Sequence, residues 1–440
     1  TRKNTALLIG DLKLEQAKDA LIAAYLNETT LYVKSAYLTA LGKLDVRENL
    51  EFFKNRLLEV KNQQVPAEEQ KHQGEEIREL NEIILKTEGA KKHQFTGFQM
   101  PHEMLLLTNR EQREVTFSEV KEIGASVQRK AELHPLGVLV FSKEVTPFTK
   151  LRTYRELLFP IHTNERIPAM PHRAAELLWH SDLYAFLTEC HEGDAPFFFR
   201  LEVKSAETKT EFVKKLGASL EKKSDWKLAN STTDYEIEIR LIEAKDGSFV
   251  PFLKLYSMKM KRFAYRKNAI AMSIHPATAA MLMYLAKPYL KENAQILDPC
   301  CGVGTMLIER DILVPAREKY GIDIFGDAID MARENAALAG EKINFIHRDY
   351  FDFKHDYKFD EIVTNMPVKG KKAKEDMDAF YARFFEKSKS LLAQDGIIIM
   401  YSNEVGFVKK QLRLQPCYRL IQEYTIRKKD SYCLFIIGMK

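Results

Sequence analysis

The stretch LDPCCGVGT, residues 297–305, decides how the second half of this 440-residue chain should fold. It follows a short apolar run and leads into GTMLIERDIL, which predicts a strand, a glycine-rich turn and a helix. Gly302 and Gly304 let the backbone turn tightly and approach a ligand, and the helix that follows offers free N–H groups. Leu307 stands where a dinucleotide fingerprint needs a third glycine, which argues against NAD.

Strand-like and helix-like segments alternate from about residue 290, and polar side chains stand at or just after the strand ends. This rhythm predicts a doubly wound sheet with a ligand cleft at the carboxyl ends of its strands. Asp298 can accept a hydrogen bond from an ammonium group, Asp323 can bind both hydroxyls of a ribose, and Asp349 suits an adenine amino group. With Asn365 after the fourth strand, the set predicts a site for adenosine that carries an amino-acid tail.

The first 95 residues have a helical pattern. LEQAKDALIAAYL and YVKSAYLTALGKL place apolar residues at i, i+3, i+4 and i+7, with almost no glycine or proline inside. Paired helices of this kind are typical of HEAT-type repeats, and a generic small helical bundle fits equally well.

Residues 100–265 have a different texture, in which strands and helices interleave without a parallel rhythm. The pattern predicts a helix in YRELLFPIHT (154–163) and two strands around the Lys-Asp-Gly turn of DYEIEIRLIEAKDGSFVPFLKLYS (234–257). The segment is therefore predicted to be a compact α+β region.

The composition limits the class of protein and its compartment. The chain is 45% hydrophobic and 29% charged, with a net charge of only +5, so a basic surface has to be sought in local clusters. No run of 18 apolar residues is present, which predicts no membrane span. Five unpatterned cysteines indicate a reducing compartment, so we expect a cytoplasmic protein. Neither the cysteines nor the histidines have the spacing of a metal site.

Residues 268–440 resemble a class I S-adenosylmethionine-dependent methyltransferase, and in detail the RNA guanine-N2 methyltransferases that carry a THUMP domain. The pattern Asp-Pro-x-Cys-Gly-x-Gly-Thr falls on residues 298–305, and Ala-x-x-Asn falls on Ala332–Asn335. Residues 100–265 resemble, more faintly, the ferredoxin-like plus THUMP-like RNA-binding region of that family. The resemblance implies a seven-stranded Rossmann-like α/β domain, preceded by this α+β region and an added all-α segment at 1–95.

The resemblance also implies a cofactor and its contacts. S-adenosylmethionine is expected as the methyl donor, and metal ions are not expected. The residues expected to bind the cofactor are Asp298, Cys300, Gly302, Gly304, Thr305, Asp323, Ile324, Asp349, Tyr350 and Asn365.

The expected acceptor motif departs from the family pattern. Amino-methylating enzymes usually read Asn-Pro-Pro-Tyr, and this chain reads Asn365-Met366-Pro367-Val368. The asparagine oxygen and the next carbonyl would accept the two N–H bonds of the acceptor amine, and the aromatic ring would stack on the flipped base. Val368 cannot stack, so an aromatic residue from elsewhere is needed, with Phe380, Tyr381 and Tyr401 as candidates.

RNA, with tRNA favoured over rRNA, is the expected substrate, and guanine N2 the expected acceptor. Three alternatives stay open: rRNA guanine-N2 methylation, DNA adenine-N6 methylation, and a weakly active or inactive scaffold that binds S-adenosylmethionine. A protein partner for the N-terminal helices is also considered, because their charge is mixed. The basic residues expected to contact RNA, with one tyrosine among them, are Lys261, Arg262, Tyr265, Arg266, Lys369, Lys371 and Lys372.

Overall fold

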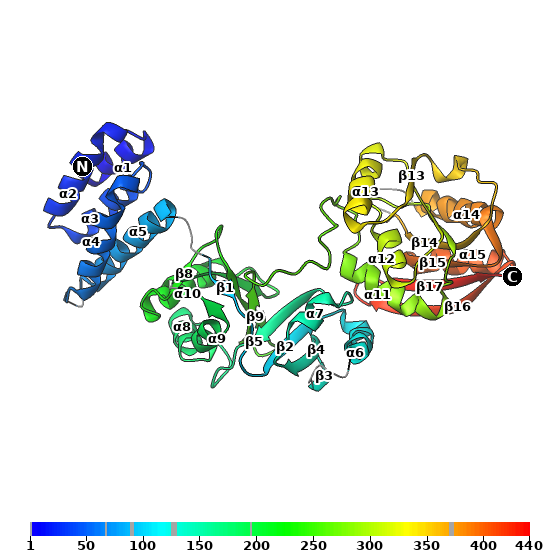
Figure 1. Cartoon of the computed structure of the whole chain (residues 1–440), viewed down its shortest axis with the longest axis horizontal. Helices are drawn as coiled ribbons and strands as arrows, with labels where there is room; N and C mark the ends of the chain where they lie inside the picture. Colours follow the sequence, from blue (N-terminus) through cyan, green and yellow to red (C-terminus); the bar gives the residue numbers. More distant parts are fainter. Residues whose placement is uncertain (1, 67, 89–91, 125–129, 194–195, 369–373) are drawn as a thin grey trace. The chain divides into compact units, whose positions relative to one another are not determined.

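The computed structural model describes residues 2–66, 68–88, 92–124, 130–193, 196–368 and 374–440 (Figure 1). The chain divides into two compact units, each built from two stretches of sequence. One unit contains Thr1–Thr96 and Ile161–Ser257, and the other contains Gly97–Pro160 and Met258–Lys440. The region expected at 100–265 is thus divided, because its first part is grouped with the C-terminal domain.

The C-terminal domain is built on a sheet of seven strands within the described residues, in the order β13-β12-β11-β14-β15-β17-β16. The pairs from β13 to β15 are parallel, whereas β17 is antiparallel to both β15 and β16. The strands are β11 (Gln295–Asp298), β12 (Glu318–Asp323), β13 (Asn344–His347), β14 (Phe359–Asn365), β15 (Leu392–Ser402), β16 (Tyr418–Arg427) and β17 (Tyr432–Met439).

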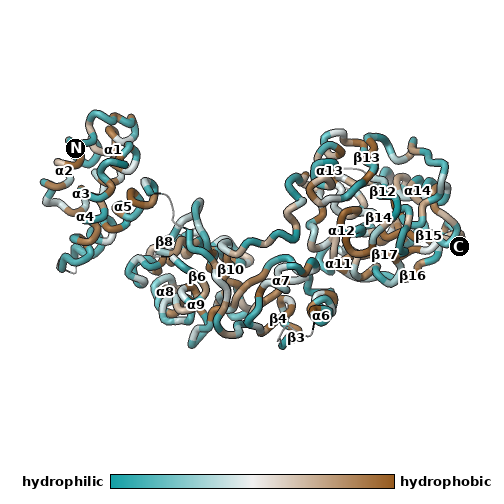
Figure 2. Tube along the Cα trace, in the orientation of Figure 1, coloured by the Kyte–Doolittle hydropathy of each residue, from teal (hydrophilic) through white to brown (hydrophobic). Residues whose placement is uncertain are grey.

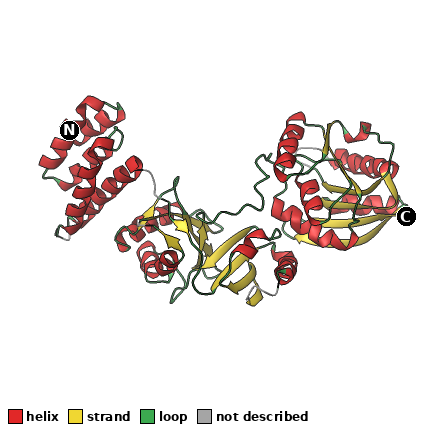
Figure 3. Ribbon diagram, in the orientation of Figure 1, coloured by secondary structure: helices red, strands yellow, loops and turns green. Residues whose placement is uncertain are grey.

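Helices cover both faces of this sheet, as the sequence rhythm predicts (Figure 3). Ile362 and Val363 are neighbours on β14 and belong to different apolar clusters, because successive strand residues point to opposite faces. One cluster includes α14 and α15, and the other includes α11. The helices are α11 (Pro276–Ala286), α12 (Thr305–Leu313), α13 (Gly326–Ala339), α14 (Lys374–Leu391) and α15 (Val405–Leu414), with short 3-10 turns η4 (Lys287–Tyr289) and η5 (Tyr350–Asp352). Apolar stretches, coloured brown in Figure 2, lie within this domain.

The same unit contains a small α+β segment before residue 161. Its strands pair antiparallel in the order β3-β4-β2-β5. The elements are β2 (His102–Leu107), η3 (Arg110–Gln112), α6 (Arg113–Glu122), β3 (Lys130–His134), β4 (Gly137–Ser142), α7 (Thr146–Lys150) and β5 (Glu156–Pro160).

The helix expected at 154–163 is wrong, because β5 occupies its middle. Leu157, Leu158 and Phe159 are all buried, and Leu157 and Leu158 pair with β2. An apolar run of this length fits a buried strand as well as a helix, and Pro160 ends it.

The other unit contains a second α+β segment. β9 and β10 form the expected hairpin, with Gly247 at a φ of +78° in the turn, and β7 pairs parallel with β8 and β9. The elements are β1 (Gln94–Phe95), α8 (Pro171–Trp179), α9 (Leu183–Glu189), β6 (His191–Glu192), β7 (Phe197–Lys204), α10 (Thr210–Lys223), β8 (Leu228–Asn230), β9 (Ile237–Glu243) and β10 (Phe249–Leu255).

The N-terminal residues are helical throughout, with one shared apolar core that includes Tyr25, Leu38, Phe53 and Leu80. The elements are α1 (Arg2–Asp11), η1 (Glu15–Ala17), α2 (Lys18–Asn27), α3 (Leu31–Leu41), η2 (Arg47–Asn49), α4 (Leu50–Asn62) and α5 (Gln70–Glu88). In the described part of the chain, no helix combines the length and the apolar character that a membrane crossing requires.

Candidate active site

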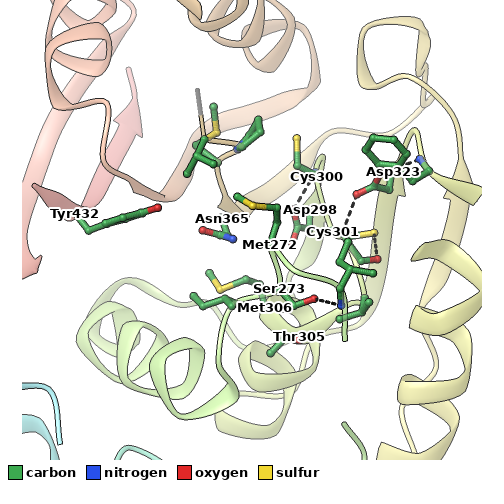
Figure 4. A pocket seen from close by; sticks show the side chains of 18 residues that line it. Met272, Ser273, Asp298, Cys300, Cys301, Thr305, Met306, Asp323, Asn365 and Tyr432 are labelled. Carbon is green, nitrogen blue, oxygen red and sulfur yellow. Dashed lines mark hydrogen bonds between the residues drawn. The ribbon is translucent and has the colours of Figure 1, made fainter. Parts of the chain in front are cut away.

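Three strand ends bring polar side chains to one edge of the C-terminal sheet. Asp298 ends β11, Asp323 ends β12 and Asn365 ends β14. These strands are parallel, so their carboxyl ends meet, and the three side chains line one pocket of about 340 Å³ (Figure 4). The pocket has the size and location of a small-molecule site in an open α/β sheet.

Asp298 is buried at the floor of the pocket. Its Oδ1 accepts a hydrogen bond from the backbone N–H of Cys300 at 3.0 Å, whereas its Oδ2 is buried and has no partner among the described residues. Burial raises the pKa of the Asp298 carboxyl to about 8. A buried carboxyl with one unpartnered oxygen is suited to form a hydrogen bond with a polar group of a ligand that enters the pocket.

The glycine-rich turn is fastened to the second strand. The Gly302 N–H donates to Asp323 Oδ2 at 2.8 Å, and the Phe325 N–H donates to Asp323 Oδ1 at 3.0 Å. Gly302 and Gly304 have φ values of +50° and +82°, which favour glycine. A Cβ on Gly304 would also lie 2.9 Å from the Phe345 ring. Both the positive φ and this close approach therefore exclude a side chain at Gly304.

The expected acceptor motif forms another wall of the pocket. Asn365, Met366, Pro367 and Val368 all line it. The Met366 N–H donates to the Tyr401 carbonyl at 2.9 Å, which fixes the turn after β14 to β15. The Asn365 side-chain amide has no hydrogen-bond partner within the described residues, so both of its polar atoms are available to a ligand.

Four residues expected to bind the cofactor do not line this pocket. Tyr350 is only 4% exposed, and its hydroxyl is 2.9 Å from Ser388 Oγ in the core below the sheet, which corrects its expected role. Ile324 is 57% exposed and lies outside the pocket lining. The Asp349 carboxylate caps η5 by accepting from the Phe351 N–H, and Gly304 lies behind the turn against Phe345.

Sequence reasoning missed several residues that line the pocket. Phe325 lines the pocket in place of Ile324. The chain turns after Asp323, so the second residue after it faces the pocket. Tyr432, at the start of β17, comes from a hairpin about 65 residues downstream of the acceptor motif, and no local pattern links the two. The remaining additions are Ile270, Met272, Ser273, Ile274, Cys301, Val303 and Met306.

Two residues of the basic stretch 258–267 that were expected to contact RNA make contacts inside the protein instead. Arg262 is half-buried over the Tyr154 ring and donates to the carbonyls of Leu151, Tyr154 and Arg155. Tyr265 is 5% exposed, and its hydroxyl donates to Glu309. Arg262 thus holds residues 151–155, whereas Tyr265 holds Glu309. The burial of Tyr265 corrects its expected role at RNA.

The other expected RNA contacts are placed differently. Lys261 is exposed, and Arg266 donates to the Ile274 carbonyl at 3.3 Å, next to the pocket wall. Lys369, Lys371 and Lys372 lie outside the residues that the structure describes. Within the described residues, all five cysteines are free thiols and no cluster of potential metal ligands occurs.

Comparison with known families agrees with this geometry. Residues 264–429 match the family described as RMKL-like, methyltransferase domain. Residues 264–429 are an RMKL-like methyltransferase domain. The match includes the glycine-rich turn, the acceptor motif and the strand ends between them, so the pocket is the candidate active site of a methyltransferase domain.

Relatives of this methyltransferase domain include two named as guanine-N2 methyltransferases of RNA. The tRNA (guanine(10)-N2)-dimethyltransferase of Methanothermobacter thermautotrophicus is 32% identical over 162 residues, which is 36% of this chain and 46% of that protein. The U6 snRNA (guanine-N(2))-methyltransferase THUMPD2 of Bos taurus is 26% identical over 192 residues, which is 43% of this chain and 36% of that protein. The matches therefore span about half or less of these two relatives.

Solved structures share the fold over a longer stretch. TrmN from Thermus thermophilus superposes with a TM-score of 0.54 at 19% identity, over 77% of this chain and 99% of that one. SMU.472 complexed with SAH gives a TM-score of 0.57 at 14% identity, over 77% of this chain and 98% of that one. At these identities the likeness shows the fold alone.

Proposed function

We propose that this chain transfers a methyl group from S-adenosylmethionine to an exocyclic amine of an RNA base, with guanine N2 in tRNA as the acceptor. One observation carries the proposal. Asp298, Asp323 and the acceptor asparagine, Asn365, line a single pocket, so a methyl donor and an amine would meet there.

The pocket residues fit such a donor. Asp298 Oδ2 and Thr305 Oγ1 are buried without a partner among the described residues, so each can bind a polar ligand group. Each Asp323 oxygen accepts one backbone N–H and has a second lone pair free for a ribose hydroxyl. When bound, S-adenosylmethionine supplies a methyl group on a positively charged sulfur, which keeps the electron pair of the broken C–S bond.

The acceptor wall supplies positioning. The Asn365 side-chain oxygen and the Met366 carbonyl would accept the two N–H bonds of the amine and turn its lone pair toward the donor. The nitrogen then forms the new N–C bond and releases one proton. Little acid–base catalysis is needed, since the rate depends chiefly on reacting atoms held near 3–3.5 Å and in line.

The choice of RNA and of guanine N2 rests on similarity and charge. The relatives named above act on tRNA and on U6 snRNA, as their names state. Lys261 remains a proposed RNA contact on the exposed surface of the chain, and Lys369, Lys371 and Lys372 remain proposed contacts next to the acceptor motif.

Labelled methyl transfer tests the proposal. The full chain is incubated with methyl-labelled S-adenosylmethionine and either bulk small RNA or DNA, beside the variant Asn365→Ala. We expect label in RNA and a decrease of about 100-fold for Asn365→Ala, because a misplaced amine loses its alignment with the methyl group. Calorimetric binding of S-adenosylmethionine should be unchanged in the variant if Asn365 acts on the acceptor.

Two results would contradict the proposal. Transfer to RNA no faster than that of Asn365→Ala would leave a protein that only binds the cofactor. Faster transfer to DNA than to RNA would favour the adenine-N6 alternative.

A further inference from the structure

The acceptor wall lacks the aromatic ring that a flipped base needs. Val368 lines the pocket where an aromatic residue is usual, and its side chain has no π-face. The three replacements expected from the sequence are not available. Tyr381 is fully buried with its hydroxyl 2.7 Å from Ser402 Oγ, Tyr401 is 4% exposed, and Phe380 packs on Phe351 outside the pocket lining.

Tyr432 lines the same pocket from another strand. β15 pairs parallel with β14 through Asn365 and Tyr401, and antiparallel with β17 through Ser402 and Cys433. The start of β17 therefore lies at the same sheet edge as the end of β14. Figure 4 shows the Tyr432 side chain reaching from that strand toward Asn365.

The Tyr432 ring is held in a defined orientation. It stacks on Tyr401 with ring centroids 4.8 Å apart and an interplanar angle of 27°. The Arg427 guanidinium lies 4.8 Å from the ring centroid and is itself paired with Asp430. Tyr432 is only partly buried, so its remaining surface is open to the pocket.

The two aromatic side chains in the pocket lining lie on opposite sides of Asn365 in the strand order. Phe325 follows Asp323 on β12, and Tyr432 begins β17, while β14 with Asn365 lies between them in the sheet. The Phe325 side is that of the expected ribose and adenine contacts. The Tyr432 side is therefore the one left for the acceptor base.

We propose that Tyr432 supplies the aromatic contact to the acceptor base that Val368 cannot make. The inference rests on the proposed function, since it concerns the base that enters the same site. It assigns this chain's base-contacting residue to the β16–β17 hairpin and leaves Asn365 and Met366 to hold the amine.

Tyr432→Leu and Tyr432→Phe separate the ring from simple packing. Leucine keeps an apolar side chain against Tyr401, and phenylalanine keeps the ring. Tyr357→Leu is the matched control, because Tyr357 is 73% exposed in the same domain and does not line the pocket. Single-turnover methyl transfer to bulk small RNA is measured for each full-length variant, with S-adenosylmethionine affinity by calorimetry as the check on folding.

We expect Tyr432→Leu to lower kcat/KM for RNA by about 10- to 100-fold, and Tyr432→Phe to stay within about threefold of the unaltered protein. Tyr357→Leu should match the unaltered protein, and cofactor affinity should be the same for all. Equal rates for Tyr432→Leu and the unaltered protein would overturn the inference. Equal losses for the leucine and phenylalanine variants would overturn it too, because they would assign the effect to the hydroxyl.

A second readout keeps the inference testable if no methyl transfer occurs. RNA containing 6-thioguanosine is irradiated with the unaltered full chain, and the cross-linked peptide is identified by mass spectrometry. A guanosine adduct on the peptide that contains Tyr432 would support the base contact even if the proposed activity fails. Adducts confined to other peptides would contradict it.

Discussion

Folding makes the carboxyl of Asp298 harder to ionise. Its pKa is raised to about 8 because the group is buried, so in the folded protein it keeps a proton that the unfolded chain loses near pH 4. Below pH 4 the carboxyl is protonated in both states and contributes no pH dependence. Between about pH 4 and 8 the unfolded state binds fewer protons, so the free energy of unfolding falls as pH rises, by up to about 1.4 kcal/mol per unit.

Asp298→Asn removes the loss of stability that the ionisable carboxyl causes as pH rises. We expect the variant, without added cofactor, to gain stability relative to the unaltered protein as pH rises from 5 to 8, because asparagine has no proton to lose. Urea denaturation at several pH values measures the difference, in which all other titrating groups cancel. Parallel pH profiles for the two proteins would show that Asp298 is ionised in the folded state at neutral pH.

At the same scale, the sequence predicted which strand ends bring polar side chains together. Asp298, Asp323 and Asn365 were predicted because parallel strands place their carboxyl ends together, and each lines the pocket. Phe325 and Tyr432 were missed because a turn and a distant hairpin bring them in, and neither leaves a periodic signal. The cofactor contact predicted for Tyr350 was wrong, since its position next to Asp349 in the sequence does not determine which way the ring points.

The helix α12 links the glycine-rich turn to the segment before residue 161. Its Glu309 is 1% exposed and accepts from Arg152 Nε and Nη2, both at 2.8 Å, and from the Tyr265 hydroxyl. Arg152 also donates to the Arg262 carbonyl at 2.8 Å. This network joins the two halves of the unit, so its loss should destabilise the unit as a whole.

Glu309→Ala should lower the free energy of unfolding by about 3–5 kcal/mol, because it leaves a largely buried arginine without its partner. Asp330→Ala is the matched control: Asp330 pairs with Arg333 on the exposed face of α13, and its loss should cost less than about 1 kcal/mol. Urea unfolding of the full chain measures both. Similar small losses for the two variants would contradict the structural role of the network.

Elements were predicted best where length and periodicity agreed. The α/β alternation after residue 290 and the β9–β10 hairpin follow from strong patterns with glycine turns. The strand β5 was mistaken for a helix because ELLFP has no periodicity that distinguishes a strand from a helix. Its pairing with β2 depends on tertiary contacts, which the local sequence does not reveal.

At the scale of the whole chain, the two compact units do not follow sequence order. The segment Gly97–Pro160 is grouped with the methyltransferase domain, and Ile161–Ser257 is grouped with the N-terminal helices. No local signal predicts such an exchange, because it depends on contacts between residues far apart in sequence, of which Arg152 with Glu309 is one. The helices at 2–88 have no assigned partner, and a protein surface remains a hypothesis for them.

The nucleoside that receives the methyl group distinguishes guanine-N2 methylation from the alternatives. The full chain is incubated with small RNA and methyl-labelled S-adenosylmethionine, and the RNA is then digested to nucleosides and analysed by mass spectrometry. We expect label in N2-methylguanosine, and we expect Asn365→Ala to reduce it to background. Label in N6-methyladenosine or 5-methylcytidine, or no label in any nucleoside, would contradict the proposed function.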